Sequence, residues 1–357
     1  YCIKVLWEPV GQKERIMLQE SIAKLVAHEN LSQNEALTDM REIMSGQAEP
    51  AAVASFLTAL SMKGETVDEI TACAQGMTEA ATQIHPNGEL LEIVGTGGDK
   101  AGTFNISTTS MFVIASAGVH VAKHGNRGVS SRSGAADVLE HLGVKIDNPP
   151  SFTEQMENDI GIAFLFAPVY HSAMRYVAPV RKSMGIRTVF NILGPLTNPA
   201  NPQLALIGVY SKELVRPIAE VLQKRGLERA LVVFGNDVLD EISASAKTTV
   251  AELKDGAIRE YTIDPRDYGL PMATKEELVG GNPEENAQIT RAILAGKERG
   301  AKRNAVLLNA GAGLYLSGKA EDLADGIRLA GELIDSGKAL AKLEEMIDYS
   351  QKGQKAC

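Results

Sequence analysis

The sequence predicts an α/β protein with a small N-terminal helical domain and a larger α/β domain on a mainly parallel central sheet. Three observations support this fold class. Residues 12–83 show helical periodicity, short apolar runs alternate with helical patterns from Leu91 onward, and the turn at 85–88 (HPNG) separates the two patterns. The length of 357 residues is that of about two domains.

The helical domain should contain four short helices joined by tight turns. Residues 32–35 (SQNE) and 66–69 (TVDE) are capping-box patterns, so they predict where the second and fourth helices begin. Gly46 suits the end of the second helix. We assign residues 12–83 to this domain and expect helices from about 168–196 to pack on it.

The α/β domain should comprise residues 84–167 and 197–350. Its candidate strands are 91–94, 119–123, 144–147, 162–166, 204–209 and 230–234. Helical patterns fall between them, for example at 135–142, 152–158 and 212–225. Residues 248–263 read as a hairpin around Asp255-Gly256. Ligands of such a domain should bind at the carboxyl ends of the parallel strands.

Composition and charge exclude several classes of protein. The net charge of −9, the isoelectric point near 5.3 and the 5% aromatic content disfavour a nucleic-acid-binding surface. No apolar run approaches the ~20 residues of a membrane span. The three cysteines, Cys2, Cys73 and Cys357, have no metal-ligand spacing, so we expect a reducing, cytoplasmic setting without disulfides.

Three kinds of anion-binding chemistry lie together between Leu91 and Gly134. The glycine turn at 95–99 (GTGGD) follows an apolar run, so backbone N–H groups can approach an anion there. The hydroxyl cluster at 105–110 (NISTTS) precedes another apolar run, as at a helix N-terminus. A basic, hydroxyl-rich loop occupies 123–133. The stretch therefore predicts a phosphate site.

Each feature also has a plainer interpretation, as a turn, a helix cap or a solvated loop. The hydroxyl cluster has more groups than one cap needs, which favours a ligand, and Ser107 is a candidate oxygen ligand for Mg²⁺. Lys123 ends an apolar run, where an unpaired cation is costly. His124 could transfer protons, although a single histidine is more often structural.

Two further groups of charged residues could complete a site. The adjacent carboxylates Asp240 and Glu241 should point to different sides of an extended chain, which suits two neighbouring Mg²⁺ ions. A solvated acidic loop is the alternative. The segment after Pro168 carries several cations, and an arginine there that faced the cleft could bind an acidic second substrate: Arg175, Arg181, Lys182 and Arg187.

Taken together, these motifs resemble those of the anthranilate phosphoribosyltransferase family. The matching segments are VGTGGD (94–99), FNIST (104–108), KHGNRGVSSRSGAADVLEHLG (123–143), PVRKSMGIRTVFNILGPLTNP (179–199), LDEIS (239–243) and NAVLLNAGAGLYLSG (304–318). The resemblance covers about Leu18 to Leu343, and the order of the motifs is more specific than any one of them.

The resemblance implies an activity and an assembly. The family transfers the phosphoribosyl group of phosphoribosyl pyrophosphate (PRPP) to the amine of anthranilate, giving N-(5-phosphoribosyl)anthranilate and pyrophosphate in tryptophan biosynthesis. Its fold is that of the nucleoside phosphorylases and related phosphoribosyltransferases. Members are usually homodimers through the helical domain. A pyrimidine nucleoside phosphorylase-like enzyme and a non-enzymatic nucleic-acid-binding relative of the fold are the alternatives.

The resemblance also implies residue roles. PRPP would be bound by Gly95, Gly98, Asp99, Thr103, Asn105, Ile106, Ser107, Thr108, Lys123, His124, Gly125, Asn126, Arg127, Gly128, Val129, Ser130, Ser131 and Ala135. Anthranilate would be positioned, or its entry lined, by Gly95, His124, Asn126, Pro168, His171 and Arg181. Mg²⁺, as two ions, would be held by Ser107, Asp240 and Glu241. Catalysis would be electrostatic, with Lys123 and Arg181 as positioning groups.

One residue departs from the family pattern. The family often has glycine before the Leu-Asp-Glu segment, where this chain has Val238. The substitution affects the expected flexibility of the loop rather than the identity of the metal ligands.

Overall fold

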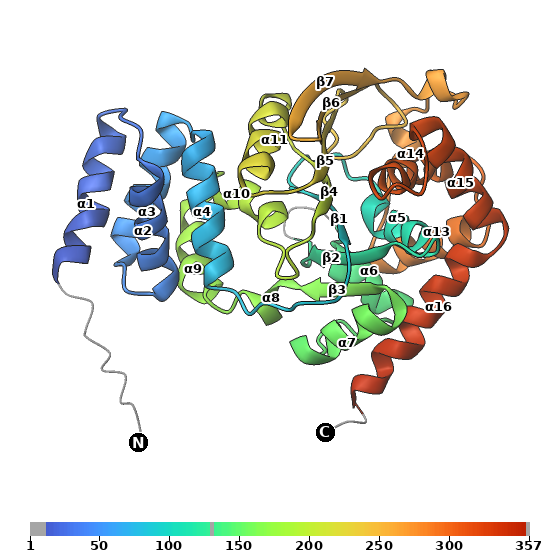
Figure 1. Ribbon diagram of the computed structural model, residues 1–357, viewed down its shortest axis with the longest axis horizontal. Coiled ribbons are helices and arrows are strands. Elements are labelled where there is room, and N and C mark those ends of the chain that lie inside the picture. The colour runs from blue at the N-terminus through green and yellow to red at the C-terminus, as the bar shows by residue number, and fades with distance from the viewer. Residues whose placement is uncertain (1–11, 129–131, 355–357) are drawn as a thin grey trace. The chain divides into compact units, whose positions relative to one another are not determined.

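The computed structural model describes residues 12–128 and 132–354, and the chain divides into two compact units (Figure 1). The first unit contains the described residues up to Ala80 together with Ser172–Phe190. The second contains Ala81–His171 and the chain from Asn191 onward. A helical unit and a larger unit on a mostly parallel sheet confirm the predicted fold class.

The helical unit consists of the four predicted helices and one from the middle of the chain. They are α1 (Gln12–Val26), α2 (Gln33–Ser45), α3 (Pro50–Lys63), α4 (Val67–Glu79) and α9 (Met174–Met184). Both predicted capping boxes form, at Ser32 and Thr66, and Gly46 ends α2 in the left-handed conformation with φ 77°. Helix α9 packs against α2 and α3 within this unit.

The second unit is built on a seven-stranded sheet of order β3-β2-β1-β4-β5-β6-β7. The strands are β1 (Leu90–Gly95), β2 (His120–Gly125), β3 (Ile162–Phe166), β4 (Leu204–Gly208), β5 (Arg229–Gly235), β6 (Thr248–Lys254) and β7 (Ala257–Ile263). The first five in sequence are parallel, while β6 and β7 form the predicted antiparallel hairpin.

Helices cover both faces of this sheet. Figure 1 shows α11 on one face and α5 and α14 on the other. The α-helices of the unit are α5 (Ile106–Ala115), α6 (Ala135–Leu142), α7 (Pro150–Ile160), α8 (Ala167–Tyr170), α11 (Val215–Lys224), α12 (Lys275–Leu278), α13 (Pro283–Leu294), α14 (Ala301–Leu316), α15 (Leu323–Asp335) and α16 (Lys338–Ser350). Helix α10 (Phe190–Leu193) begins at the boundary, and short 3₁₀ helices are η1 (Gly194–Leu196), η2 (Lys212–Leu214), η3 (Pro265–Tyr268) and η4 (Gln351–Gln354).

The predicted strand at 144–147 is wrong. This segment is an irregular connection between α6 and α7, although Val144 and Ile146 are buried and their neighbours are less so. The alternation of apolar and polar residues is typical of a strand, but the backbone of this segment does not pair with the sheet. The N–H of Lys145 instead donates to the Ser350 hydroxyl at 3.0 Å. The other five predicted strands are present within a residue or two of the expected bounds.

The division into units falls a few residues from the predicted domain boundaries. Residues 81–83, 168–171 and 191–196 lie with the sheet unit because backbone hydrogen bonds tie them to it. The N–H of Thr82 donates to Tyr170 O at 2.9 Å, and the N–H of Ile84 donates to Pro199 O at 3.1 Å. Within the described residues, no helix has the length and apolar content needed to cross a membrane.

Candidate active site

The predicted phosphate stretch surrounds the carboxyl ends of neighbouring parallel strands. Strands β1 and β2 end at Gly95 and Gly125, and β5 ends at Gly235 two strands away in the same sheet. Helix α5 starts after the β1 loop and packs against β1 and β2. Parallel strands end at one edge of a sheet, so these loops and the start of α5 converge there.

The glycine loop after β1 packs closely on the loop after β5. The N–H of Gly97 donates to the Asp240 carboxylate at 2.6 Å. A side chain at Gly95 would clash with that carboxylate, and one at Gly208 would clash with the Asp240 backbone. Gly97 and Gly98 also have left-handed φ values of 70° and 74°, which favour glycine. Glycine is therefore required here by both close approach and backbone conformation.

Residues 102–104 hold the far end of the glycine loop against the segment before α13. Thr103 forms a backbone bridge with Val279, and the N–H of Gly280 donates to Gly102 O at 3.0 Å. The side chain of Asp99 accepts the N–H of Ala101 at 3.2 Å. The loop that carries Gly98 and Asp99 is thus anchored at both ends.

The start of α5 has an N-cap residue whose side chain does not cap the helix. Asn105 occupies that position, but its side-chain oxygen accepts the Ser133 hydroxyl at 3.1 Å and the Asn286 amide at 2.9 Å. The N–H of Ser107 donates to Glu241 at 3.2 Å. Asn105 therefore does not cap the helix, and the group that accepts from the first turn is the anionic carboxylate of Glu241, as expected at the positive end of a helix dipole.

Lys123 is a buried cation between the strands and α5. Its side chain is 2% exposed, and its Nζ donates to Ile93 O at 2.5 Å and to Ser107 Oγ at 3.3 Å. Burial lowers the pKa of Lys123, while Glu92 and Glu241 oppose that change. The predicted strand-end lysine thus lies beside two of the predicted metal ligands.

The adjacent carboxylates Asp240 and Glu241 point to different partners. Asp240 accepts from Gly97 on the glycine loop, and Glu241 accepts from Ser107 on α5. Burial raises the pKa of Glu241 to about 7, and burial followed by repulsion from Asp99 raises that of Asp240. Lys123 is the cation that opposes the rise for Glu241. The shifts mean that negative charge here is incompletely compensated by the protein.

This donor set suits a hard cation that also takes ligands from its substrate. Ser107, Asp240 and Glu241 all offer oxygen, which is what Mg²⁺ binds. Over the described part of the chain, no group of three or more His, Cys, Asp and Glu residues is arranged to hold a metal alone. Substrate oxygens and water would have to complete the coordination.

The loop after β2 is held at its two stems by α6. The Asp137 carboxylate accepts the N–H of Gly128 at 2.8 Å and of Gly134 at 2.9 Å. Arg127 forms ion pairs with Asp137 and Glu140, so its guanidinium is directed to α6. Asn126 is exposed, and Ala135 is the first residue of α6. The predicted ligands Val129, Ser130 and Ser131 lie outside the described residues.

Two buried histidines form a neutral pair beside this loop. The rings of His124 and His171 are 5.0 Å apart, and His124 Nδ1 is 3.3 Å from Gly194 O. Burial lowers the pKa of His124 to about 3 and that of His171 to about 4. Pro168 lies in α8, directly after β3. Because both rings are neutral, they are better suited to contact an aromatic ligand than to bind an anion.

Arg181 belongs to the helical unit. It lies in the last turn of α9, and its guanidinium is 5.3 Å from the centre of the Phe190 ring in the same unit. Burial lowers its pKa, although an arginine stays charged at any physiological pH. The stacked guanidinium has a defined orientation in which its fork can bind a carboxylate.

Sequence reasoning missed two buried polar residues that contact β2, Glu92 within β1 and Asn198 in the segment between η1 and β4. The Glu92 carboxylate is completely buried, accepts the N–H of His124 at 3.0 Å and accepts the side-chain amide of Asn198. The signal was available in part, because an acidic residue inside the apolar run 91–94 needs a buried partner.

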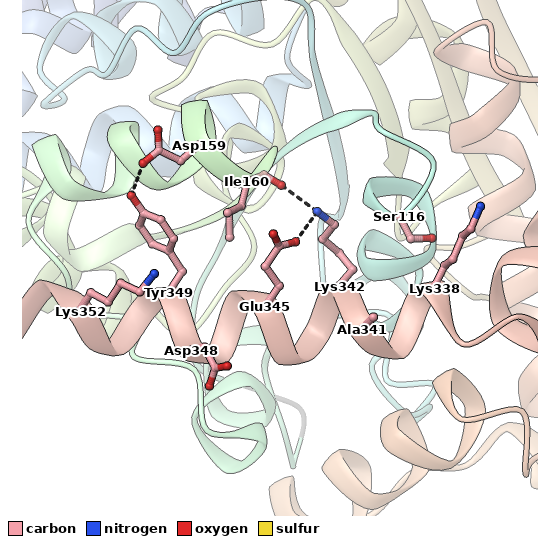
Figure 2. A pocket seen from close by; sticks show the side chains of 10 residues that line it. All are labelled: Ser116, Asp159, Ile160, Lys338, Ala341, Lys342, Glu345, Asp348, Tyr349 and Lys352. Carbon is pink, nitrogen blue, oxygen red and sulfur yellow. Dashed lines mark hydrogen bonds and ion pairs between the residues drawn. The ribbon is translucent and has the colours of Figure 1, made fainter.

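A hollow elsewhere in this unit is lined by several charged side chains. It lies along α16 and reaches Ser116 at the carboxyl end of α5, and Figure 2 shows Lys342 and Tyr349 bonded to other residues of its lining. Lys342 donates to Ile160 O at 2.9 Å and to Glu345 at 2.6 Å, and the Tyr349 hydroxyl donates to Asp159. Of these contacts, the one between Lys342 and Glu345 is an ion pair of opposite charges.

Comparison with known proteins shows the family of this chain. The family model described as the glycosyl transferase family, a/b domain, matches residues 87–340, and that of the helical bundle domain matches residues 19–81. Anthranilate phosphoribosyltransferase from Methanobrevibacter smithii is 54% identical over 94% of this chain and 99% of its own length. The chain belongs to the anthranilate phosphoribosyltransferase family.

Solved structures of the family share the whole fold. Anthranilate phosphoribosyltransferase from Thermus thermophilus has a TM-score of 0.88 and 45% identity, covering 93% of this chain and 99% of its own. The Saccharomyces cerevisiae enzyme in complex with PRPP and Mg has a TM-score of 0.86 and 31% identity, covering 94% and 98%. Both units of this chain therefore have counterparts in the family.

Proposed function

We propose that this protein transfers the phosphoribosyl group of PRPP to the amine of anthranilate and releases pyrophosphate, as a step of tryptophan biosynthesis in the cytoplasm. One observation carries the proposal within the chain. A glycine loop, the start of α5, Lys123 and the Asp240–Glu241 pair converge at one edge of the sheet. Family membership supplies the identity of the two substrates.

PRPP would bind along this edge through the residues that the sequence predicts. The glycine loop would offer backbone N–H groups to the pyrophosphate, and Ser107 and Thr108 would add hydroxyls at the positive end of α5. Lys123 would offset negative charge as the bond between C1′ and pyrophosphate breaks. The residues that follow β2, from Asn126 to Gly128, would contact the ribose and its phosphate.

Two Mg²⁺ ions would be held by Ser107, Asp240 and Glu241 together with oxygens of PRPP. The divergent contacts of the two carboxylates, one toward Gly97 and one toward Ser107, favour two ions over one. When bound, Mg²⁺ would stabilise the charge that grows on the leaving pyrophosphate. Raised carboxylate pKa values favour the same assignment, because a cation would remove the repulsion that causes part of them.

Anthranilate would be oriented by its carboxylate. Arg181 would bind that carboxylate bidentately, and Asn126 would lie near the amine that attacks C1′. His124, Pro168 and His171 would line the approach for the aromatic ring. The amine is already a neutral nucleophile, so the reaction needs orientation and charge stabilisation more than a strong general base.

Anthranilate fluorescence tests the proposed reaction directly. The signal should disappear only when protein, PRPP and Mg²⁺ are all present, with formation of one pyrophosphate for each anthranilate consumed. Phosphorolysis of thymidine without turnover of PRPP would instead indicate a nucleoside phosphorylase. No turnover of either substrate, with a salt-sensitive shift of nucleic acid in a gel, would indicate the non-enzymatic relative.

Arg181→Ala should separate the two substrates. We expect the KM for anthranilate to rise about 100-fold, since a bidentate charged contact contributes about 1.5–3 kcal/mol and also orients the ring. The dissociation constant of PRPP, measured by calorimetry with Mg²⁺, should change less than about threefold. Arg175→Ala on the same helix is the matched control. Equal losses for both substrates would contradict the role of Arg181.

A homodimer through the helical unit is part of the same proposal. An apolar hollow between α1 and α3 is lined by Leu25, Ala54 and Ala59, among others, and two further lining residues, Val26 and Met62, are 67% and 75% exposed. Such exposed side chains favour a covered face. The mass of the protein in solution, measured by light scattering, tests this part; a monomer at micromolar concentration would exclude it.

A further inference from the structure

Strands β1 and β2 separate before they reach the site. Their parallel pairing covers only two positions, Leu90 with His120 and Leu91 with Val121. By contrast, β1 pairs with β4 as far as Gly95. Strand β2 likewise stays paired with β3 over five positions, as far as Gly125. The gap is therefore specific to the β1–β2 pair, on one side of each strand.

The register specifies which backbone groups lose their partners. In a continued parallel ladder, the N–H of Ile93 would donate to Ala122 O, and the N–H of His124 would donate to Ile93 O. All three residues belong to buried strand segments. Unpaired backbone groups there would each cost about 1–3 kcal/mol.

Three side chains take the place of these ladder bonds. The Glu92 carboxylate accepts the N–H of His124, the Asn198 amide donates to Ala122 O at 2.7 Å, and Lys123 Nζ donates to Ile93 O at 2.5 Å. Asn198 also donates to Glu92, which joins two of them. The remaining group is the N–H of Ile93. It hydrogen-bonds the Glu92 carboxylate and so opposes the rise in the pKa of Glu92 that burial causes.

Asn198 is itself fixed by the chain that follows it. Its side-chain oxygen accepts the N–H of Ala200 at 2.8 Å, so the amide group can point only toward Ala122 and Glu92. Both Glu92 and Asn198 are buried, with 0% and 4% exposure. Neither contacts Ser107, Asp240 or Glu241 through any of these bonds. Their common effect is on the path of β2 and on the place of Lys123.

We propose that Glu92 and Asn198 are positioning residues, which hold β1 and β2 apart at their carboxyl ends so that Lys123 reaches the PRPP site. Without them the two strands could pair one step further, and the N–H of His124 would displace Lys123 from Ile93 O. Lys123 would then lose the contact that directs its Nζ to Ser107 Oγ. This inference rests on the proposed function, since it assigns the two residues to the donor half of that reaction.

The positioning role can be tested by substitutions of Glu92 and Asn198 that either remove or keep their hydrogen-bonding groups. Glu92→Leu and Asn198→Leu should each raise the KM for PRPP about 10- to 100-fold, as displacement of a binding group by an ångström does, with a smaller change in kcat. Glu92→Gln should raise the KM for PRPP less than Glu92→Leu does, because its amide oxygen still accepts from His124 and Asn198 and only the bond from the Ile93 N–H loses its acceptor. Amide hydrogen exchange at Ile93 and His124 should differ between the Leu and Gln variants.

Glu157→Gln is the matched control, since Glu157 on α7 is a buried carboxyl group 3.1 Å from the Nδ1 of His120, the first residue of β2. It should leave the KM for PRPP unchanged. If Glu92→Leu does not fold, Asn198→Ser carries the same test, because it removes the donor to Ala122 O with a smaller change. A KM for PRPP that stays at the wild-type value in the folded variants overturns the inference. Wild-type protein that does not turn over PRPP and anthranilate overturns the proposed function instead.

Discussion

The two ends of strand β2 carry the same residue types in different arrangements. At the amino end, His120 Nδ1 lies 3.1 Å from the buried carboxylate of Glu157, and β2 is paired there with β1. At the carboxyl end, the Glu92 carboxylate binds the backbone N–H of His124, and the ladder to β1 is absent. Glu157 contacts a side chain of β2, whereas Glu92 accepts a backbone N–H of β2 that a neighbouring strand would otherwise bind.

The comparison shows how two neighbouring strands can separate while their backbone groups remain hydrogen-bonded. Polar side chains at the carboxyl end satisfy the backbone groups that a neighbouring strand would otherwise take, so the strands separate and the space between them becomes available. The amino end keeps its ladder and stays closed. We therefore expect substitutions of the polar residues at the first end to affect function, and ionisation of Glu157 at the second end to affect stability.

The largest effect should come from the carboxylates at the open edge. Asp240→Asn combined with Glu241→Gln should lower kcat/KM about 1,000-fold or more, because loss of charge stabilisation worth several kcal/mol translates into that factor. The dependence of rate on Mg²⁺ concentration should move to much higher concentrations. Initial rates across a Mg²⁺ titration provide the measurement.

Another adjacent acidic pair offers a matched control for that experiment. Glu344 and Glu345 lie on α16, where they bond Arg291 and Lys342 near solvent. Replacing both by glutamine removes the same number of charges from the same unit, and the Mg²⁺ titration should not change. If the two double variants behave alike, the assignment of Asp240 and Glu241 to the metal is wrong.

A smaller effect is expected at the closed end of β2, and it should depend on pH. Burial raises the pKa of Glu157 from 4.5 to about 8, so the folded protein holds this proton more tightly than the unfolded chain does. Wild-type stability should therefore fall as the pH rises from about 4.5 through about 8. Glu157→Gln removes the ionisation and should be more stable than wild type at pH 9 by about 1–3 kcal/mol.

Thermal unfolding at pH 6 and pH 9 measures this difference. The melting temperature of Glu157→Gln relative to wild type should increase between the two pH values, and turnover at pH 8 should match wild type. A constant difference across this range would mean that Glu157 does not change its protonation there. Loss of turnover would remove the distinction between the two ends of β2.

The parts of the fold that local chemistry determines were predictable from the sequence. Capping residues marked the starts of α2 and α4, and apolar runs marked five parallel strands. The segment 144–147 was misassigned because burial alternates along it while its amide partner, Ser350, lies 205 residues away. Local pattern carries no information about such a partner.

The same limit explains the site. Lys123, Ser107 and Glu241 could be predicted as neighbours only through resemblance to a family, because Ser107 and Glu241 are 134 positions apart. Glu92 attracted no interpretation, since its partner Asn198 is 106 positions away. Arg127 was predicted to face phosphate, and the structure pairs it with two carboxylates of α6 that helical spacing brings to one side.

The smallest effect concerns Val238, just before the acidic pair. Its φ of 72° lies in the left-handed region, which costs a β-branched residue about 1–2 kcal/mol, and its side chain is 49% exposed. Val238→Gly should therefore stabilise the protein by up to about 1 kcal/mol, the relief of strain being partly offset by the greater freedom of glycine in the unfolded chain. Val279 is equally exposed at 48%, but its φ is −59°, so Val279→Gly should destabilise by about 0.5–1 kcal/mol. Chemical denaturation of both variants measures the contrast, and destabilisation by both would mean that the loop does not store strain at Val238.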